Sequence, residues 1–404
     1  MYYTLLITFL LSVQAINCTN SKAKTQAPDY QTAESPEVLP GAHQTEQYLP
    51  MLDGKKVGLV VNHTSTIGSV HLADSLMASG IEVTKIFAPE HGFRGTASAG
   101  KKLEDGLDPK TGLPVISLYG ATRKPTLEHL RDLDVVVFDI QDVGVRFYTY
   151  ISTMSLVMEA CAEQKVPVMI LDRPNPNGHY VDGPIREEAY KSFVGMHPVP
   201  VVYGMTIGEY ATMVNHEGWL QDQLQCDLTI IKCKNYSHQS KYDLPIKPSP
   251  NLPNLRSILL YPSLCFFEGT VLSIGRGTET QFQVIGHPDL PESNYSFTPR
   301  DQEGAVNPKL EGKLCQGESL TYLSEDELFE RKAVDLQYLI KYYQLFPNKD
   351  NFFLPSLWID KLAGTTKLRE AIIAGQTAEQ IRMNWQEDLK DFKLLRSKYL
   401  LYPE

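Results

Sequence analysis

The chain has little of what several large classes of protein require. Only six of its 404 residues are cysteines, and their spacing matches no zinc-ligand pattern. The formal net charge is -10, whereas nucleic-acid binding depends on a basic face. The glycine signatures of dinucleotide sites, triphosphate sites and α/β-hydrolases are absent. These absences argue against a zinc domain, a nucleic-acid-binding protein and a nucleotide-dependent enzyme, and we expect no cofactor.

Long apolar segments are also scarce, and the notable one lies at the N-terminus. Leu5–Val13 is too short to span a membrane and is typical of a signal-peptide core. Cys18 resembles the acylated cysteine of a bacterial lipoprotein, with cleavage near Ala15 as the alternative. Residues 19–48 are rich in Ser, Thr, Gln, Pro and Glu, which predicts a flexible tether. We therefore expect a signal peptide over residues 1–18 and an exported periplasmic or cell-envelope lipoprotein, with any membrane contact through the lipid.

The other cysteines offer one candidate disulfide. An odd number of cysteines remains after Cys18, so at least one thiol stays unpaired. Cys226 and Cys233 are close enough in sequence to bridge a short hairpin. The alternative is that these thiols are buried and behave as small apolar side chains.

From about residue 49 the pattern is a repeated strand followed by a helix. Continuous apolar strands separated by helices predict a parallel sheet covered on both faces. We therefore expect an α/β fold with a Rossmann-like, doubly wound sheet over residues 49–284 and a smaller mixed α/β C-terminal domain over residues 285–404. The Pro/Asn-rich stretch 248–262 is expected to cross the surface or to line a cleft. The predicted strands are 57–61, 83–88, 115–118, 134–138, 166–171 and 227–232, and the predicted helices include 71–77, 149–164, 207–217, 367–374 and 377–398.

Polar residues follow these strands at the points where the strands end. In doubly wound sheets ligands bind in the crevice outside the carboxyl ends of the strands, so one edge of the sheet should gather these side chains into a site. The alternative is that they cap the helices that follow. The residues concerned are Asn62, His63, Glu90, His91, Asp139, Asp142 and Asp172.

The loop after the second predicted strand is the strongest of these candidates. Pro89 stops the strand because it lacks an amide hydrogen, and Glu90 and His91 follow it directly. Gly92 and Gly95 bracket the turn and permit positive φ or close approach of a ligand. An ordinary strand-to-helix turn is the alternative interpretation.

Six motifs, taken in order, resemble one known family. They are Asn62-His-Thr, Pro89-Glu-His-Gly-Phe-Arg-Gly, Asp139-Ile-Gln-Asp-Val-Gly-Val-Arg-Phe-Tyr-Thr-Tyr-Ile, Leu171-Asp-Arg-Pro-Asn-Pro-Asn-Gly, Asp182-Gly-Pro and the stretch 198–209. Together they resemble the exo-β-N-acetylmuramidases of glycoside hydrolase family 171, long catalogued as a domain of unknown function. The resemblance implies release of terminal N-acetylmuramic acid from the non-reducing ends of peptidoglycan fragments. It also implies a Rossmann-like domain, a smaller C-terminal domain, a cleft between them and a catalytic glutamate at Glu90.

Glycoside hydrolysis needs an acid and usually a second carboxylate. We assign Glu90 as the general acid, with Asp139, Asp142 and Asp172 as candidates for the second group. The substrate's own acetamido group is the alternative nucleophile, with an aspartate orienting it.

The lactyl carboxylate of muramic acid should be bound by a guanidinium group. Arg146 and Arg276 are the first candidates, and Arg94 is the third. The other residues that we expect to contact the sugar are Asn62, His63, His91, Tyr148, Asp172 and Asn175.

Two other classes of function remain open from the sequence. A non-catalytic lipoprotein that captures cell-wall fragments would need the same carboxylates and arginines. A metal-dependent hydrolase using His63, His91 and Asp139 would need ligands brought together from separate strand ends.

Overall fold

The structure is a computed structural model that describes residues 36–90, 92–94, 105–120, 122–302 and 304–404. The predicted signal peptide, Cys18 and His91 lie outside these residues. Residues 37–404 form one compact unit.

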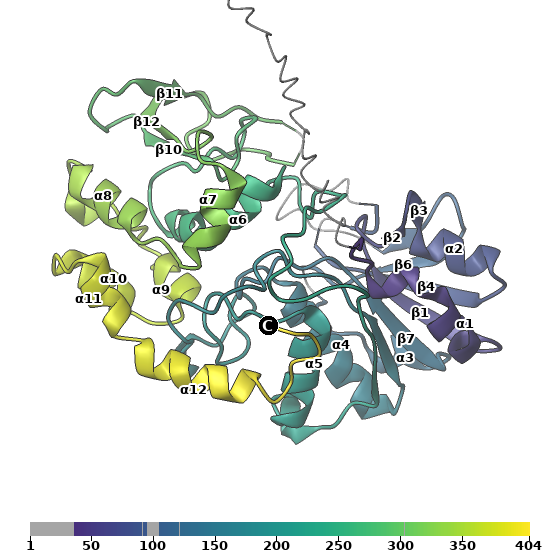
Figure 1. Cartoon of the computed structure of the whole chain (residues 1–404). Helices are drawn as coiled ribbons and strands as arrows, with labels where there is room; N and C mark the ends of the chain where they lie inside the picture. Colours follow the sequence, from purple (N-terminus) through teal and green to yellow (C-terminus); the bar gives the residue numbers. More distant parts are fainter. Residues whose placement is uncertain (1–35, 91, 95–104, 121, 303) are drawn as a thin grey trace, which may run out of the picture. The chain divides into compact units, whose positions relative to one another are not determined.

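A seven-stranded sheet forms the centre of the N-terminal part (Figure 1). Its order is β5-β6-β4-β1-β7-β8-β9, and every neighbouring pair is parallel except β5 with β6. Leaving out the edge strand β5, this is the 3-2-1-4-5-6 order of the Rossmann fold, so the predicted doubly wound sheet is confirmed. The strands are β1 (Lys56–Val61), β4 (Glu82–Ala88), β5 (Gly106–Leu107), β6 (Pro114–Ser117), β7 (Val135–Asp139), β8 (Val168–Leu171) and β9 (Leu228–Ile231).

Helices cover both faces of this sheet because its strands are apolar on both sides. Successive side chains of a strand point to opposite faces. Accordingly Val57, Leu59 and Val61 of β1 join one core cluster, with α1 and α2, and Val60 joins the other, with α3, α4 and α5. The helices are α1 (Thr45–Leu52), α2 (Leu72–Ala78), α3 (Leu127–Leu130), α4 (Tyr150–Gln164) and α5 (Ile207–His216).

The folded part begins earlier than the predicted tether allows. Gly41 donates its amide to the carbonyl of Asp172 at 2.7 Å, and a Cβ atom at Gly41 would lie 2.2 Å from the carbonyl oxygen of Ile231. In α1, Tyr48 and Leu52 are completely buried. Two apolar residues spaced by one helical turn suffice to dock a segment whose average composition is polar, so residues 41–48 belong to the folded part and not to the predicted tether.

The C-terminal part is a mixed α/β assembly, as predicted. Its antiparallel sheet has the order β10-β12-β11. These strands lie together in Figure 1, apart from the large sheet. The elements are α6 (Leu255–Leu264), β10 (Val284–His287), β11 (Tyr295–Phe297), β12 (Cys315–Ser319), α7 (Glu325–Arg331), α8 (Gln337–Leu345), α9 (Trp358–Ala363), α10 (Lys367–Ile373), α11 (Ala378–Met383) and α12 (Gln386–Arg396). A short hairpin, β2 (Thr66–Ile67) and β3 (Val70–His71), precedes α2.

The prediction that residues 248–262 cross the surface or line a cleft is confirmed in its second form, because a cavity is lined by Ser249, Asn251, Leu252 and Tyr261. The stretch does not simply cross the surface, since most of it is buried. Helix α6 begins after Asn254, whose side chain accepts the amide of Ser257 at 2.9 Å in a capping box. Ile258 and Leu260 are almost completely buried. Most of the prolines precede the cap, where they do not interfere with the helix.

The described cysteines are buried free thiols. Cys226 and Cys233 therefore do not form the candidate bridge. Burial raises the pKa of the Cys226 thiol to about 12, so this side chain acts as a small apolar group.

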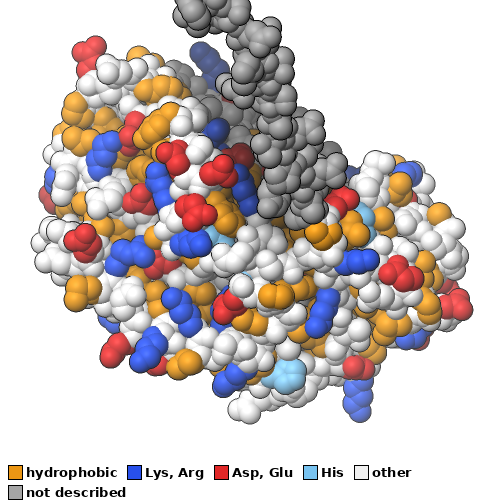
Figure 2. All heavy atoms as spheres, in the orientation of Figure 1, with side chains coloured by type: hydrophobic (Ala, Val, Ile, Leu, Met, Phe, Trp, Pro, Cys, Tyr) orange, Lys and Arg blue, Asp and Glu red, His pale blue; other side chains and the backbone are white. Residues whose placement is uncertain are grey.

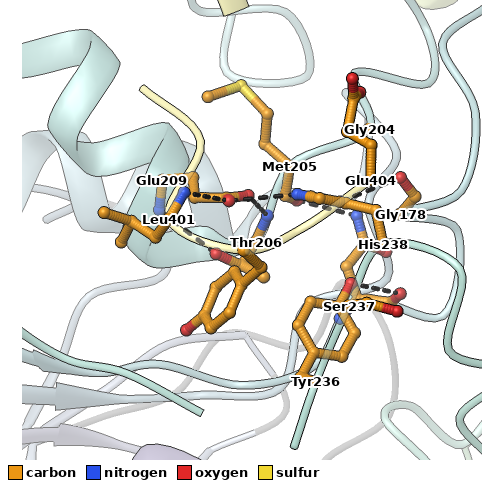
Figure 3. A network of polar contacts seen from close by, with 12 residues as sticks. Gly178, Gly204, Met205, Thr206, Glu209, Tyr236, Ser237, His238, Leu401 and Glu404 are labelled. Carbon is orange, nitrogen blue, oxygen red and sulfur yellow. Dashed lines mark hydrogen bonds and ion pairs between the residues drawn. The ribbon is translucent and has the colours of Figure 1, made fainter. Parts of the chain in front are cut away.

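The C-terminal segment returns to helix α5 and the sheet, where Figure 3 shows its polar contacts. Glu209 in α5 accepts the amide of Leu401 at 2.7 Å and lies 3.1 Å from His238 Nε2. The side chains of Glu209 and His238 are both buried. The hydroxyl of Tyr402 donates to Asp172 at 2.5 Å. The end of the chain is thus part of the core of the N-terminal fold.

The visible surface carries both signs of charge. Figure 2 shows Lys and Arg side chains interspersed with Asp and Glu on this face. Within the described residues, no helix combines the length and the apolar character needed to cross a membrane.

Candidate active site

A cavity of about 460 Å³ lies beyond the carboxyl ends of β4 and β6 and reaches the C-terminal part. Its volume suits a small ligand of one or two sugar rings. The N-terminal part contributes Glu90, Tyr119, Arg123, Phe147, Tyr148, Thr149, Tyr150, Ser192, Phe193 and Val194, and residues after 248 contribute Ser249, Asn251, Leu252, Tyr261, Glu268, Arg276, Phe282, Trp358 and Lys361.

Glu90 reaches the cavity because its loop turns sharply after β4. The amide of Gly92 donates to the carbonyl of Pro89 at 3.0 Å, and Gly92 has a φ of 78°, which favours glycine. Burial and the neighbouring Glu90 carboxylate raise the pKa of the Tyr119 hydroxyl to about 12. Glu90 is partly exposed, so a proton on its carboxyl group would be within reach of a ligand.

A second carboxylate, Glu268, lines the same cavity. It lies in a short helical turn after α6 and accepts Nε of Arg276 at 2.7 Å. Arg276 also stacks 5.1 Å above the ring of Phe282. We did not predict Glu268 from the sequence. The feature of the sequence that could have indicated it is its position beside Gly269 and shortly before the Gly275-Arg-Gly277 turn.

Asp139 and Asp172, two of the predicted candidates for the second catalytic group, do not line the cavity. Both oxygens of Asp139 accept from Arg173, at 2.5 and 2.9 Å. Asp172 accepts the hydroxyl of Thr206 at 2.7 Å and the amide of Gly208 at 2.8 Å. Both carboxylates are completely buried, so their oxygens are occupied in holding the strand ends together and we do not retain them as catalytic residues.

Asp142 is a buried carboxyl group away from the cavity lining. Its Oδ2 accepts from the Tyr203 hydroxyl and from the amide of Gly144, the latter at 2.7 Å. Its Oδ1 has no hydrogen-bond partner among the described residues. Burial raises the pKa of Asp142 to about 7. The side chain is thus suited to a structural role as a neutral acid.

The raised pKa of Asp142 predicts an effect of pH on stability. The folded state holds this proton more tightly than the unfolded state, so the stabilisation is complete below pH 3.8 and is lost as the pH rises to about 7. Asp142→Asn cannot ionise at this position. Its free energy of unfolding, relative to that of the wild type, should therefore rise across this range by up to about 1.4 kcal/mol per pH unit. Urea unfolding at several pH values measures the difference. The exposed Asp132→Asn is the control, and parallel profiles for Asp142→Asn and the wild type would contradict the prediction.

Arg146 is also placed differently from the sequence prediction. Its guanidinium is completely buried and donates to the carbonyls of Pro184, Val199 and Leu362 at 2.8, 2.6 and 2.9 Å. These bonds occupy Nη1 and Nη2, and Nε, which has no hydrogen-bond partner among the described residues, is buried away from the cavity lining. Arg146 therefore joins segments of the fold and does not line the cavity.

The other two predicted arginines differ from each other. Arg94 donates to both oxygens of Asp108 at 3.0 and 2.8 Å, and this hydrogen bonding lowers the pKa of Asp108 to about 2. Arg94 does not line the cavity, whereas Arg276 lines it.

Of the remaining residues that we predicted to contact the sugar, some line the cavity and others do not. Tyr148 lines it, and its hydroxyl donates to the carbonyl of Pro248 at 2.8 Å. Asn62 is buried behind the lining and donates to the hydroxyl of Tyr150 at 3.0 Å. His63 contacts the carbonyl of Lys247 at 2.9 Å, and Asn175 donates to the carbonyl of Met205 at 2.8 Å; neither lines the cavity.

The metal-dependent alternative loses one of its ligands. Asp139 is already paired with Arg173, and His91 lies outside the described residues. Within the part of the chain that the structure describes, no three His, Cys, Asp or Glu side chains form a group able to hold a metal ion.

Comparison with known proteins gives matches along almost the whole chain. The family model described as "Exo-beta-N-acetylmuramidase NamZ, N-terminal" matches residues 57–256, and its C-terminal counterpart matches residues 259–402. The peptidoglycan beta-N-acetylmuramidase NamZ of Bacillus subtilis (strain 168) is 39% identical, covering 94% of this chain and 95% of the relative.

Solved structures of two DUF1343 family proteins from Bacteroides fragilis NCTC 9343 also match, each over 91% of this chain and 100% of the other. One is 48% identical with a TM-score of 0.85. The other is 31% identical with a TM-score of 0.77.

Proposed function

The chain belongs to the exo-beta-N-acetylmuramidase NamZ family, and on this premise we propose that its cavity releases terminal N-acetylmuramic acid from the non-reducing ends of peptidoglycan fragments. The enzyme is a glycosidase. The observation that carries the proposal is that two carboxyl side chains, Glu90 and Glu268, line one cavity of suitable size.

The two carboxyl groups suit the two roles that glycoside hydrolysis requires. Glu90 protonates the glycosidic oxygen as the bond from C1 to that oxygen breaks. Glu268, paired with Arg276, is the anionic partner. It acts as nucleophile, as base for the attacking water, or as the group that orients the substrate's acetamido oxygen. In each case water supplies the hydroxyl group at C1 of the released sugar.

Aromatic side chains form much of the remaining wall. They are Phe147, Tyr148, Tyr261, Phe282 and Trp358. Their rings offer apolar area at a low cost in conformational entropy, which suits the C–H faces of a pyranose. The tyrosine hydroxyls add polar groups for the sugar's own hydroxyls.

The direct test is the release of free N-acetylmuramic acid from a β-linked disaccharide with N-acetylmuramic acid at its non-reducing end, followed by mass spectrometry. The proposal requires release at equal rates with and without a chelator. Binding of the disaccharide without release would favour the rival, a protein that captures cell-wall fragments. Release abolished by the chelator would favour the metal-dependent alternative.

We also propose that the protein is exported and held in the cell envelope by a lipid on Cys18. The support is the apolar run Leu5–Val13 and the polar segment that follows. Cys18→Ser should move the protein from the membrane to the soluble fraction, while the purified domain keeps its activity because the cavity lies beyond the tether. Fractionation with immunoblotting measures this. A wild-type protein that already fractionates as soluble would contradict the lipid attachment.

A further inference from the structure

The cavity carries more positive than negative charge, unlike the chain as a whole. Arg123, Arg276 and Lys361 line it, together with the two carboxyl groups of Glu90 and Glu268. The whole chain has a formal net charge of -10, and on the face shown in Figure 2 the two signs are mixed. Because Arg276 is paired with Glu268, the excess positive charge lies at Arg123 and Lys361.

Each of these two cations lies against an aromatic ring. The Arg123 guanidinium carbon lies 4.3 Å from the ring centroid of Phe193, and Lys361 Nζ lies 5.7 Å from that of Trp358. Both rings also line the cavity. Across the described residues, the ion pairs involve neither Arg123 nor Lys361. An aromatic face attracts a cation without cancelling its charge, so both side chains are positioned and still able to bind an anion.

We propose that Arg123 and Lys361 bind the carboxylate of the 3-O-lactyl group and thereby select muramic acid over glucosamine. The inference rests on the proposed function, since this carboxylate is what separates N-acetylmuramic acid from N-acetylglucosamine. The planar guanidinium of Arg123 can donate two parallel hydrogen bonds to the carboxylate, and Lys361 adds a point charge.

Arg276 is less suited to this role, although the sequence favoured it. Its Nε already donates to Glu268 Oε1 at 2.7 Å. A substrate carboxylate placed there would face the charge of Glu268, and like charges at such short range repel. Arg276 therefore pairs with the catalytic carboxylate of Glu268, and the exposed Arg123 and Lys361 bind the substrate carboxylate.

The test compares the nitrophenyl β-glycosides of N-acetylmuramic acid and N-acetylglucosamine. Arg123→Gln and Lys361→Met should each lower kcat/KM for the muraminide by ~10-fold or more, mainly through KM, because each removes a charge-assisted hydrogen bond. The rate on the glucosaminide should be unchanged. In the double variant the preference for the muraminide should be almost lost, and Arg123→Lys should recover part of it.

Two control variants separate binding of the carboxylate from general damage. Arg131→Gln removes an exposed arginine that pairs with Glu128 outside the cavity, and both rates should stay at the wild-type level. Arg276→Gln should lower both rates together, because it removes the partner of Glu268. A double variant that keeps the wild-type ratio of the two rates would overturn the inference.

A neutral substrate tests the same point on the unaltered enzyme, so the result does not depend on the variants folding. The N-methylamide of the lactyl group keeps the size of the muraminide and removes its charge. We expect its KM to be raised by ~10-fold or more. Equal KM values for the acid and the amide would overturn the inference alone, whereas a wild type that cleaves neither glycoside would overturn the proposed function and this inference with it.

Discussion

Glu90→Gln should lower turnover on a natural disaccharide by ~10²–10⁴-fold while the substrate still binds. The amide preserves the shape of the side chain and removes the proton that the leaving oxygen needs. The free energy of unfolding should hardly change, because Glu90 is partly exposed. Single-turnover release of N-acetylmuramic acid, with the substrate affinity measured separately, gives both quantities.

The leaving group distinguishes an acid from a residue that only positions the sugar. Nitrophenolate leaves without much protonation, so Glu90→Gln should retain more of the wild-type rate on the nitrophenyl glycoside than on the disaccharide. Glu82→Gln, at the exposed start of the same strand, is the matched control and should behave as the wild type. Equal loss on both substrates would contradict the acid role, and near-normal turnover on the disaccharide would remove Glu90 from the mechanism.

Glu268→Ala should reduce turnover by ~10²–10⁴-fold on both kinds of substrate, because its role concerns attack at C1 and not protonation of the leaving group. This equal loss contrasts with the pattern expected for Glu90. The control is Glu279→Ala, an exposed glutamate three residues after Arg276 that does not line the cavity. A rate near that of the control would exclude Glu268 from catalysis.

Added azide tests whether Glu268 acts directly at C1, as nucleophile or base, or only orients the acetamido group. If this carboxylate is the nucleophile or the base, azide can enter the space left by the alanine and attack C1, which restores rate and gives a glycosyl azide of inverted configuration. If Glu268 only orients the acetamido group of the substrate, azide should not restore the rate. Nuclear magnetic resonance of the product identifies the anomer.

Acidic residues at strand ends are ambiguous candidates in the sequence, because the sequence does not show which partners each will contact. Asp139 and Glu90 both follow buried parallel strands, and the sequence placed both at the same edge of the sheet. Asp139 forms an ion pair with Arg173, 34 positions away in the chain, and is therefore not available to a ligand. Glu90 sits on a turn that carries it past the sheet edge into the cavity.

The sequence by itself determined the doubly wound sheet, its strands and the edge at which polar residues gather. These features follow from local patterns, namely apolar runs, helical spacing and Pro/Gly punctuation, which act over a few residues. The motif order likewise determined the family. The loop that presents Glu90 could be located because Pro89 and Gly92 mark its turn.

Only the tertiary structure decided which charged side chains face the cavity. Arg146 was a reasonable candidate in the sequence, but its guanidinium is buried and its Nη1 and Nη2 donate to three carbonyls from distant segments. Glu268 and Lys361 come from the C-terminal part, and no local pattern ties them to Glu90. Whether a charged group is available to a ligand depends on the donors and acceptors that folding brings to it, and those partners are set by contacts between residues far apart in the chain.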